Sequence, residues 1–365
     1  MITINQIQNS IVLVRVAFDL PSLDDTARIK DAVPTIELLL KNKNKVVLAT
    51  KWGRPKGNDP ELSTQKLIPL LQTEFDANVD FINQFASFEQ AKTEISNSQN
   101  QIFLLENTHF EADEKSKDEQ KRLELAQKYA SLADYFVDEA FPSSHRQEVT
   151  NTEIKEILPY VFGLAYANEI QNLDRLRLDV NKPFVVVMAG AKLETKLPLI
   201  TKMLPKADKI LLGGLLSFTF LQAAKDLGRG DLPDICDSYV EVEFLEQAKE
   251  LLKANPDKLV LPVDLVYEDE NGKKYGRDVG SKTVELFQNE LQKAQTIFWN
   301  GTLGFYEKPP FDKATHELGN YIASLSGAFK VLGGGDTGSS LPQNILDKLD
   351  FVSMGGGATL EYLSR

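Results

Sequence analysis

Short apolar runs alternate along this chain with longer segments in which apolar residues recur every three or four positions. The short runs, rich in Val, Ile and Leu, predict buried strands, and the longer periodic segments predict amphipathic helices. We expect strands over residues 11–16, 45–49, 102–105, 135–137, 184–188, 209–212, 258–261, 296–299 and 329–332. We expect helices over residues 27–41, 62–74, 118–131, 196–203, 240–254, 281–293 and 316–324.

Alternation of strands and helices predicts the α/β class, with parallel sheets covered by helices on both faces. The number of predicted strands is large for one open sheet, so two α/β domains are the better interpretation. A long helical pattern lies near residues 155–180 and ends at Asn181-Lys182-Pro183. We therefore predict an N-terminal lobe over residues 1–160, an interdomain helix or hinge over 161–182 and a C-terminal lobe over 183–365.

Composition narrows the function classes. The chain has 365 residues, of which 42% are hydrophobic and 26% charged, and its formal net charge is -12. This acidic balance argues against general binding to nucleic acids or membrane surfaces. An anionic ligand would therefore need a local cluster of positive charge.

The single cysteine, Cys236, excludes an intrachain disulfide framework, and we expect it to be a buried thiol. The three histidines give little basis for a zinc site. The N-terminus lacks the pattern of a signal peptide, and no apolar run approaches the roughly 18 residues of a membrane span. These features predict a cytoplasmic protein.

Four glycine clusters in the second half follow predicted strands or precede predicted helices. They read MAGAKLETK, LLGGLLSFTF (with Gly213), VLGGGDTGSS and SMGGGATLE. Glycine at the carboxyl end of a parallel strand lets a phosphate approach backbone amides and a helix N-terminus. One cluster also fits the dinucleotide fingerprint G-x-G-x-x-G, so a dehydrogenase is a competing interpretation. That fingerprint, however, normally opens the first βαβ unit and is followed by a ribose-binding acid.

Two further groups of residues are candidates for binding chemistry. Lys192 and Lys196 stand four residues apart at a predicted helix start, and Asn300 and Glu307 follow another predicted strand. In the first half, cations lie near strand ends or helix starts and predict one anion-binding patch. These cations are Arg15, Arg28, Lys51, Arg54, His109, His145 and Arg146. Arg15 interrupts an apolar strand and is either a paired structural ion or part of this patch.

Taken in order, nine motifs give the chain a resemblance to the phosphoglycerate kinase family over nearly its whole length. They are VRVAFDLP, RIKDAVPTI, GRPKG, LLENTHF, VDEAFPSSHR, GAKLETK, FWNGTLGFYE, LGGGDTGSS and SMGGGATLE. The resemblance implies two Rossmann-like lobes joined by a hinge helix. It implies reversible phosphoryl transfer, dependent on Mg²⁺, between 1,3-bisphosphoglycerate and ADP, which gives 3-phosphoglycerate and ATP. It also implies a monomeric phosphotransferase whose partners are these small molecules.

The resemblance also assigns roles to residues. Arg28, Lys192, Gly356 and Gly357 match positions that stabilise the transferring phosphoryl group. Nucleotide-binding positions match Lys196, Gly213, Asn300, Glu307, Gly334, Gly335, Asp336 and Thr337, with Asp336 also matching the Mg²⁺ segment. Substrate-binding positions correspond to Arg15, Asp19, Lys51, Arg54, His109, His145 and Arg146.

The substrate half departs from the family pattern. Ala17 stands where the family has the aspartate that binds the substrate hydroxyl, and we expect Asp19, two residues on and on the same strand face, to replace it. Lys51 replaces a histidine and His109 replaces an arginine. Two alternatives therefore remain open at this point. One is a related kinase for a different carboxylate or phospho-acid, and the other is an impaired nucleotide-binding homologue.

Overall fold

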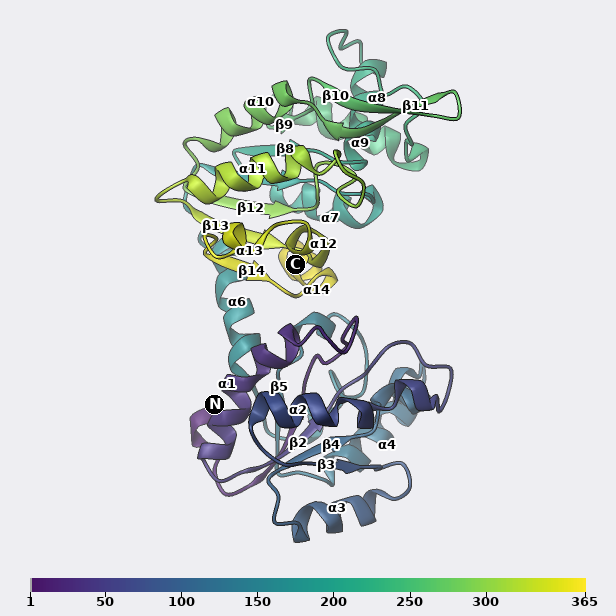
Figure 1. Cartoon of the computed structure of the whole chain (residues 1–365), viewed down its shortest axis with the longest axis vertical. Coiled ribbons are helices and arrows are strands. Elements are labelled where there is room, and N and C mark those ends of the chain that lie inside the picture. The colour runs from purple at the N-terminus through teal and green to yellow at the C-terminus, as the bar shows by residue number, and fades with distance from the viewer. Residues whose placement is uncertain (1) are drawn as a thin grey trace. The chain divides into compact units, whose positions relative to one another are not determined.

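The computed structural model describes residues 2–365 and divides into two compact units, the first ending at Gln171 and the second spanning Asn172–Arg365. Each unit is built on a six-stranded parallel sheet with helices packed on it (Figure 1). Helix α6, Leu164–Arg177, runs across the division between the units. The predicted α/β class with two parallel sheets is thus confirmed.

In the first unit the strand order is β3-β4-β2-β1-β5-β6. The chain adds strands on one side of β1 and then on the other, so the strand order reverses beside β1. The strands are β1 Ile11–Arg15, β2 Lys45–Ala49, β3 Val79–Ile82, β4 Ile102–Leu105, β5 Tyr135–Asp138 and β6 Tyr160–Phe162. The helices are α1 Ala27–Lys41, α2 Ile68–Phe75, α3 Phe88–Asn97, α4 Glu119–Ala130 and α5 Ile154–Ile157. In open parallel sheets of this kind, ligands bind outside the carboxyl ends of the strands at the reversal.

Alternate side chains of the first sheet enter two different cores. Val12, Val14 and Leu48 pack with α1 and α2 on one face. Leu13 and Val47, which point the other way, pack with α3 and α4. This two-sided burial explains why these strands read as continuous apolar runs rather than as alternating ones.

The second unit repeats the design with strand order β14-β13-β12-β7-β8-β9 and adds an antiparallel hairpin, β10-β11. The strands are β7 Phe184–Met188, β8 Lys209–Leu212, β9 Leu259–Val260, β10 Leu265–Glu270, β11 Lys273–Val279, β12 Thr296–Asn300, β13 Phe329–Gly333 and β14 Phe351–Ser353. The helices are α7 Leu193–Met203, α8 Leu216–Asp226, α9 Leu245–Ala254, α10 Ser281–Leu291, α11 Lys313–Ser324, α12 Gly335–Ser339, α13 Gln343–Leu346 and α14 Gly357–Ser364. Here the reversal falls between β7 and β12.

Two expectations about local structure are wrong. β1 ends at Arg15, so Ala17 and Asp19 lie in the loop after the strand and share no strand face. Cys236 is exposed rather than buried, and it lies in an isolated bridge to Tyr275 with a positive φ of 50°. Among residues 2–365, no helix has the length and apolar character needed to cross a bilayer.

Candidate active site

A cavity of ≈ 620 Å³ lies in the second unit at the carboxyl ends of β7 and β12, where the strand order reverses. All four predicted glycine clusters contribute residues to its lining. The cluster LLGGLLSFTF contributes Gly214. The predicted site residues that line it are Lys192, Lys196, Asn300, Glu307, Gly334, Gly335, Asp336, Thr337, Gly356 and Gly357. The topology therefore brings together residues that are spread over more than half of the unit.

Lys196 reaches into this cavity from α7. Burial of the ammonium group lowers the pKa of Lys196 to about 8, against the opposing attraction of Asp336. Its Nζ donates a hydrogen bond to Oδ1 of Asn300, and Nδ2 of Asn300 donates to the carbonyl of Gly333 at 2.6 Å. Asn300 thus holds a cation over the ends of two neighbouring strands. Lys192, in contrast, is exposed at the N-cap of α7.

Backbone atoms form the floor of the cavity. Gly301 has φ +95°, and a Cβ there would stand 1.9 Å from the carbonyl oxygen of Ala189. Its N–H donates to Oγ1 of Thr337 at 2.8 Å. A Cβ on Gly214 would stand 2.5 Å from the backbone nitrogen of Gly190. Only glycine permits this close approach of three loops, because a Cβ at Gly214 or Gly301 would meet neighbouring backbone atoms.

The same cavity has an apolar portion. Phe218, Leu265 and Phe305 line it together with Tyr306 and Glu307. Phe218 is buried, whereas Phe305 is 43% exposed. Apolar walls beside one carboxylate suit a planar base and a ribose that presents hydroxyl groups.

Asp336 is one of three carboxylate residues that line the cavity, with Asp278 and Glu307, and it is the one in the glycine-rich segment that the sequence assigned to Mg²⁺. It is exposed in the cavity, on the first turn of α12. Its negative charge partly opposes the lowering of the Lys196 pKa by burial. No group of three or more His, Cys, Asp or Glu side chains able to hold a metal occurs within residues 2–365. A single carboxylate suits Mg²⁺, which is usually bound by one or two carboxylates together with substrate phosphates and water.

Gly213 does not line the cavity, although the sequence predicted it there. A Cβ on Gly213 would stand 2.4 Å from Cδ2 of Leu303, so this glycine serves the packing of the loop. Its neighbour Gly214 is the residue of that cluster that lines the cavity.

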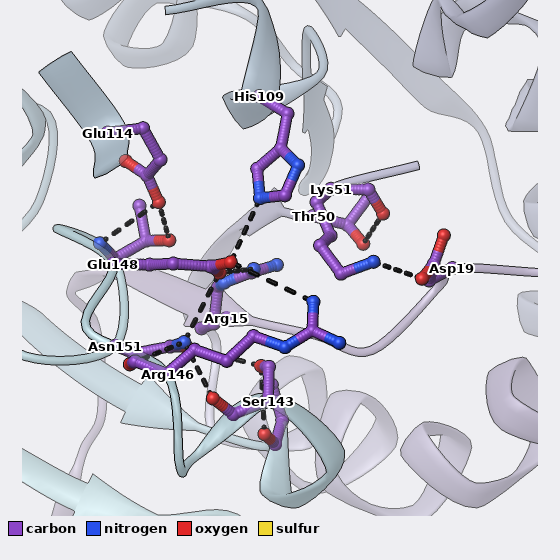
Figure 2. Close-up of polar contacts among 12 residues, drawn as sticks. Arg15, Asp19, Thr50, Lys51, His109, Glu114, Ser143, Arg146, Glu148 and Asn151 are labelled. Carbon is purple, nitrogen blue, oxygen red and sulfur yellow. Dashed lines mark hydrogen bonds and ion pairs between the residues drawn. The ribbon is translucent and has the colours of Figure 1, made fainter. Parts of the chain in front are cut away.

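In the first unit, Arg15, Lys51 and His109 lie at the carboxyl ends of β1, β2 and β4, and Arg146, from the loop after β5, lies near them (Figure 2). Arg15 is 1% exposed, and its guanidinium donates to Oε2 of Glu148 at 3.2 Å and to the carbonyl of Val16 at 3.0 Å. Burial by itself raises the pKa of Glu148, but the hydrogen bond from His109 and the charge of Arg15 lower it to about 2. The Arg15–Glu148 pair is therefore fully ionised at neutral pH.

His109 contacts the other oxygen of the same carboxylate. Its Nε2 lies 3.0 Å from Oε1 of Glu148, and its Nδ1 lies 3.4 Å from Nζ of Lys115. Burial lowers the pKa of His109 below its ordinary value, although Glu148 acts in the opposite direction. Since a lysine ammonium only donates, Nδ1 accepts and Nε2 carries the proton given to Glu148. In the neutral form that burial favours, these contacts assign the proton of His109 to Nε2.

Lys51 and Asp19 form a second pair nearby. Nζ of Lys51 contacts Oδ2 of Asp19, and the N–H of Gly53 donates to Oδ1 of Asp19 at 2.7 Å. Burial by itself raises the pKa of Asp19, but Lys51 and the Gly53 amide lower it overall. Arg28 donates to the backbone carbonyl of Asp19 at 2.7 Å. The loop after β1 is thus fixed by Lys51, which the sequence assigned to substrate binding, and by Arg28, which it assigned to the transferring phosphoryl group.

The remaining predicted cations lie nearer the surface. Arg54 and Arg146 are exposed, while Arg28 and His145 are half-buried. Arg146 NH1 is 4.0 Å from Oε1 of Glu148. Sequence reasoning missed Glu148 altogether, although an acid two residues after Arg146 in a basic motif was a usable signal.

Comparison with known proteins gives a consistent result. The family model described as phosphoglycerate kinase matches residues 2–365. The chain belongs to the phosphoglycerate kinase family. Phosphoglycerate kinases of Thermosipho africanus and Thermus thermophilus are 37% and 36% identical to it, over 96% and 97% of this chain and 92% and 94% of theirs. The solved structures of phosphoglycerate kinases from Coxiella burnetii and Pyrococcus horikoshii, each 28% identical, match with TM-scores of 0.84 and 0.81, each over 98% of this chain and 94% of the other.

Family membership decides between the interpretations left open by the sequence. The chain is a kinase, a phosphotransferase, and the dehydrogenase interpretation is wrong. The matches favour the glycolytic phosphoglycerate kinase reaction over a related kinase for another acid.

Proposed function

We propose that the protein transfers a phosphoryl group reversibly between ATP and 3-phosphoglycerate, giving ADP and 1,3-bisphosphoglycerate. The observation that supports this most is the cavity of the second unit, which combines a glycine floor with Lys196, Asn300 and Asp336. In this proposal the nucleotide phosphates lie on the backbone floor, and the base and ribose lie among Phe218, Phe305 and Glu307. Asp336 holds Mg²⁺ with the phosphates, and this ion supplies positive charge to the transferring group.

The acid substrate binds in the first unit. Arg28, Arg54, His145 and Arg146 are the predicted side chains nearest the surface there, and they hold its anionic groups. The carboxylate of 3-phosphoglycerate is already a nucleophile, so the reaction needs no general base. Positioning and positive charge around the equatorial phosphate oxygens are the main requirements.

Stabilisation of the transferring group falls to Arg28, Lys192 and the amides at Gly356 and Gly357. Gly356 is the N-cap of α14, and the N–H of Ala358 already donates to the carbonyl of Gly355, so the amides of Gly356 and Gly357 are the ones that suit an anion. Direct in-line transfer requires the two units to close, and α6 is the hinge in this proposal. In this proposal the protein is a monomer and is located in the cytoplasm.

A coupled spectrophotometric assay with ATP, Mg²⁺ and 3-phosphoglycerate tests the proposal. We expect turnover that saturates with both substrates and is abolished by chelating Mg²⁺. Absence of turnover above background at millimolar substrate contradicts the proposal. Faster turnover with another carboxylic or phospho-acid in the same assay would instead assign the different substrate.

A further inference from the structure

Glu148 is a buried acid at the centre of a patch that the sequence predicts to bind anions. It is 2% exposed and comes from the loop after β5, while Arg15 and His109 come from β1 and from the segment after β4. Figure 2 shows its carboxylate directed between these two side chains. Nδ2 of Asn151 donates to Oε2 of Glu148 at 3.3 Å and to the carbonyl of Ser143 at 2.9 Å, which fixes the loop.

Glu148 makes the contacts with Arg15 and His109 that an anionic ligand would make if Glu148 were absent. One guanidinium nitrogen of Arg15 donates a hydrogen bond to Glu148, and another donates to the carbonyl of Val16. His109 donates its one imidazole proton to Glu148 and brings no charge of its own to the pair. The inner layer of the patch, made of Arg15 and His109, is therefore already neutralised by the protein.

The outer layer is different. Arg54 and Arg146 are exposed and Arg28 is half-buried, so these three guanidinium groups are accessible to a ligand. The negative charge of Glu148 lies 4.0 Å from NH1 of Arg146, one of these three groups. Charge in a poorly solvated interior acts over longer distances than charge in water, so this acid weakens the attraction that the outer layer exerts on an anion.

We propose that Glu148 is a specificity-determining residue that acts as an internal anion. It occupies Arg15 and His109, leaves ligand binding to the outer cations and reduces the preference of the site for multiply charged phospho-acids. This inference rests on the proposed binding of 3-phosphoglycerate in the first unit. Glu148 does not contact the ligand, and it affects binding only through its electrostatic effect on the ligand and on the neighbouring cations.

The test is the dissociation constant of 3-phosphoglycerate, measured by calorimetry on the full chain and its Glu148→Gln variant without nucleotide. Removing a unit charge roughly 10 Å from a partly buried ligand changes affinity by about tenfold per ligand charge. We expect 3-phosphoglycerate, which carries about three negative charges, to bind at least about a hundredfold more tightly to the variant. Glycerate, which lacks the phosphate, should change much less, and the gain for 3-phosphoglycerate should shrink in high salt.

Glu153→Gln is the matched control. Glu153 is also a buried acid of the first unit, 5% exposed, and it is paired with Arg122. Both variants leave a buried arginine without its carboxylate and should lose stability, but only Glu148→Gln should tighten binding of 3-phosphoglycerate. Unchanged or weaker binding in Glu148→Gln, or equal tightening in Glu153→Gln, overturns the inference.

A double variant covers the case in which Glu148→Gln does not fold. Arg15→Met with Glu148→Met removes the pair without changing net charge, which buried ion pairs often tolerate. We expect its dissociation constant for 3-phosphoglycerate to stay within about threefold of the wild type, because Arg15 is not a ligand. A large loss of affinity would show that Arg15 binds the substrate directly and would overturn the inference. Turnover of the wild-type chain, assayed separately, decides the proposed function itself.

Discussion

Nζ of Lys196 donates a hydrogen bond to Oδ1 of Asn300, across 104 residues of sequence. The contact joins the first turns of α7 to the end of β12, and the second half of the Asn300 amide donates to Gly333 at the end of β13. One side chain therefore positions the cation relative to two strands. A phosphate bound on the glycine floor meets a lysine whose direction is already set.

Replacing Lys196 by Met should lower kcat/KM for ATP by about 10²–10³-fold, the usual effect of removing one group that stabilises developing negative charge. The coupled assay measures this directly. Lys202→Met is the control, because Lys202 lies on the same helix but is exposed and does not line the cavity. A similar loss in both variants would mean that α7 tolerates neither change and that Lys196 has no particular role.

The affinity for ADP should depend on pH through the same lysine. The pKa of Lys196 is about 8, so the free protein loses this positive charge as pH rises through that value. We expect the dissociation constant of Mg-ADP to increase several-fold between pH 7 and 9.5. Calorimetry at fixed Mg²⁺ checks it, and the profile of Lys196→Met should be flat. A wild-type profile as flat as that of the variant would exclude a titrating Lys196.

Gly301→Ala should destabilise the second unit by more than about 3 kcal/mol, since the new methyl meets the Ala189 carbonyl and the backbone has positive φ. Gly228→Ala separates the two causes. Gly228 has φ +85° and no atom within 4 Å of an added Cβ, so only the backbone cost of about 1–2 kcal/mol applies. Urea unfolding followed by Trp299 fluorescence, in a Trp52→Phe background, gives both values. Equal losses would show that the close approach to Ala189 relaxes without cost.

Glu114 should make the first unit less stable as pH rises. It is completely buried and accepts from the backbone N–H and the hydroxyl of Thr150 at 3.2 and 2.5 Å. Burial raises the pKa of Glu114 to about 8, although Arg15 and Thr150 oppose the shift. The folded state therefore retains a proton that the unfolded state loses near pH 4.5, and this stabilisation is lost as pH rises from about 4.5 through 8.

Glu114→Gln should flatten that slope and raise the free energy of unfolding at pH 8 by on the order of a few kcal/mol. Trp52 fluorescence during urea unfolding, in a Trp299→Phe background, reports on the first unit alone. The comparison between variant and wild type cancels the other titrating acids. If the two pH profiles run parallel, Glu114 is ionised in the folded protein.

Local pattern was sufficient to predict the central elements. Strand β2 and helix α1 have the predicted bounds because one is a short continuous apolar run and the other has a clear helical period. Pro34 does not break α1. The short edge strands β6 and β14 were missed, because three residues with mixed burial give no recognisable period. The start of α2 was placed too early, since two 3₁₀ turns precede it.

The site divides in the same way. Glycine clusters at strand ends predicted the cavity, because the chemistry lies in the local backbone. Gly213 was misplaced by one residue, since sequence does not tell which glycine of a pair faces the ligand. The Arg15–Glu148 pair joins residues 133 apart, and only the strand order brings them together.

The backbone floor at Gly190, Gly214 and Gly301 restricts how this cavity can evolve. The backbone atoms of a residue are the same for every amino acid, so a substitution does not change their chemistry. A residue larger than glycine at position 301 would clash with the carbonyl of Ala189. Selection therefore has almost no means of altering this backbone floor one substitution at a time. Changes of nucleotide preference should accumulate instead at Phe218, Phe305 and Glu307, where side chains form the wall.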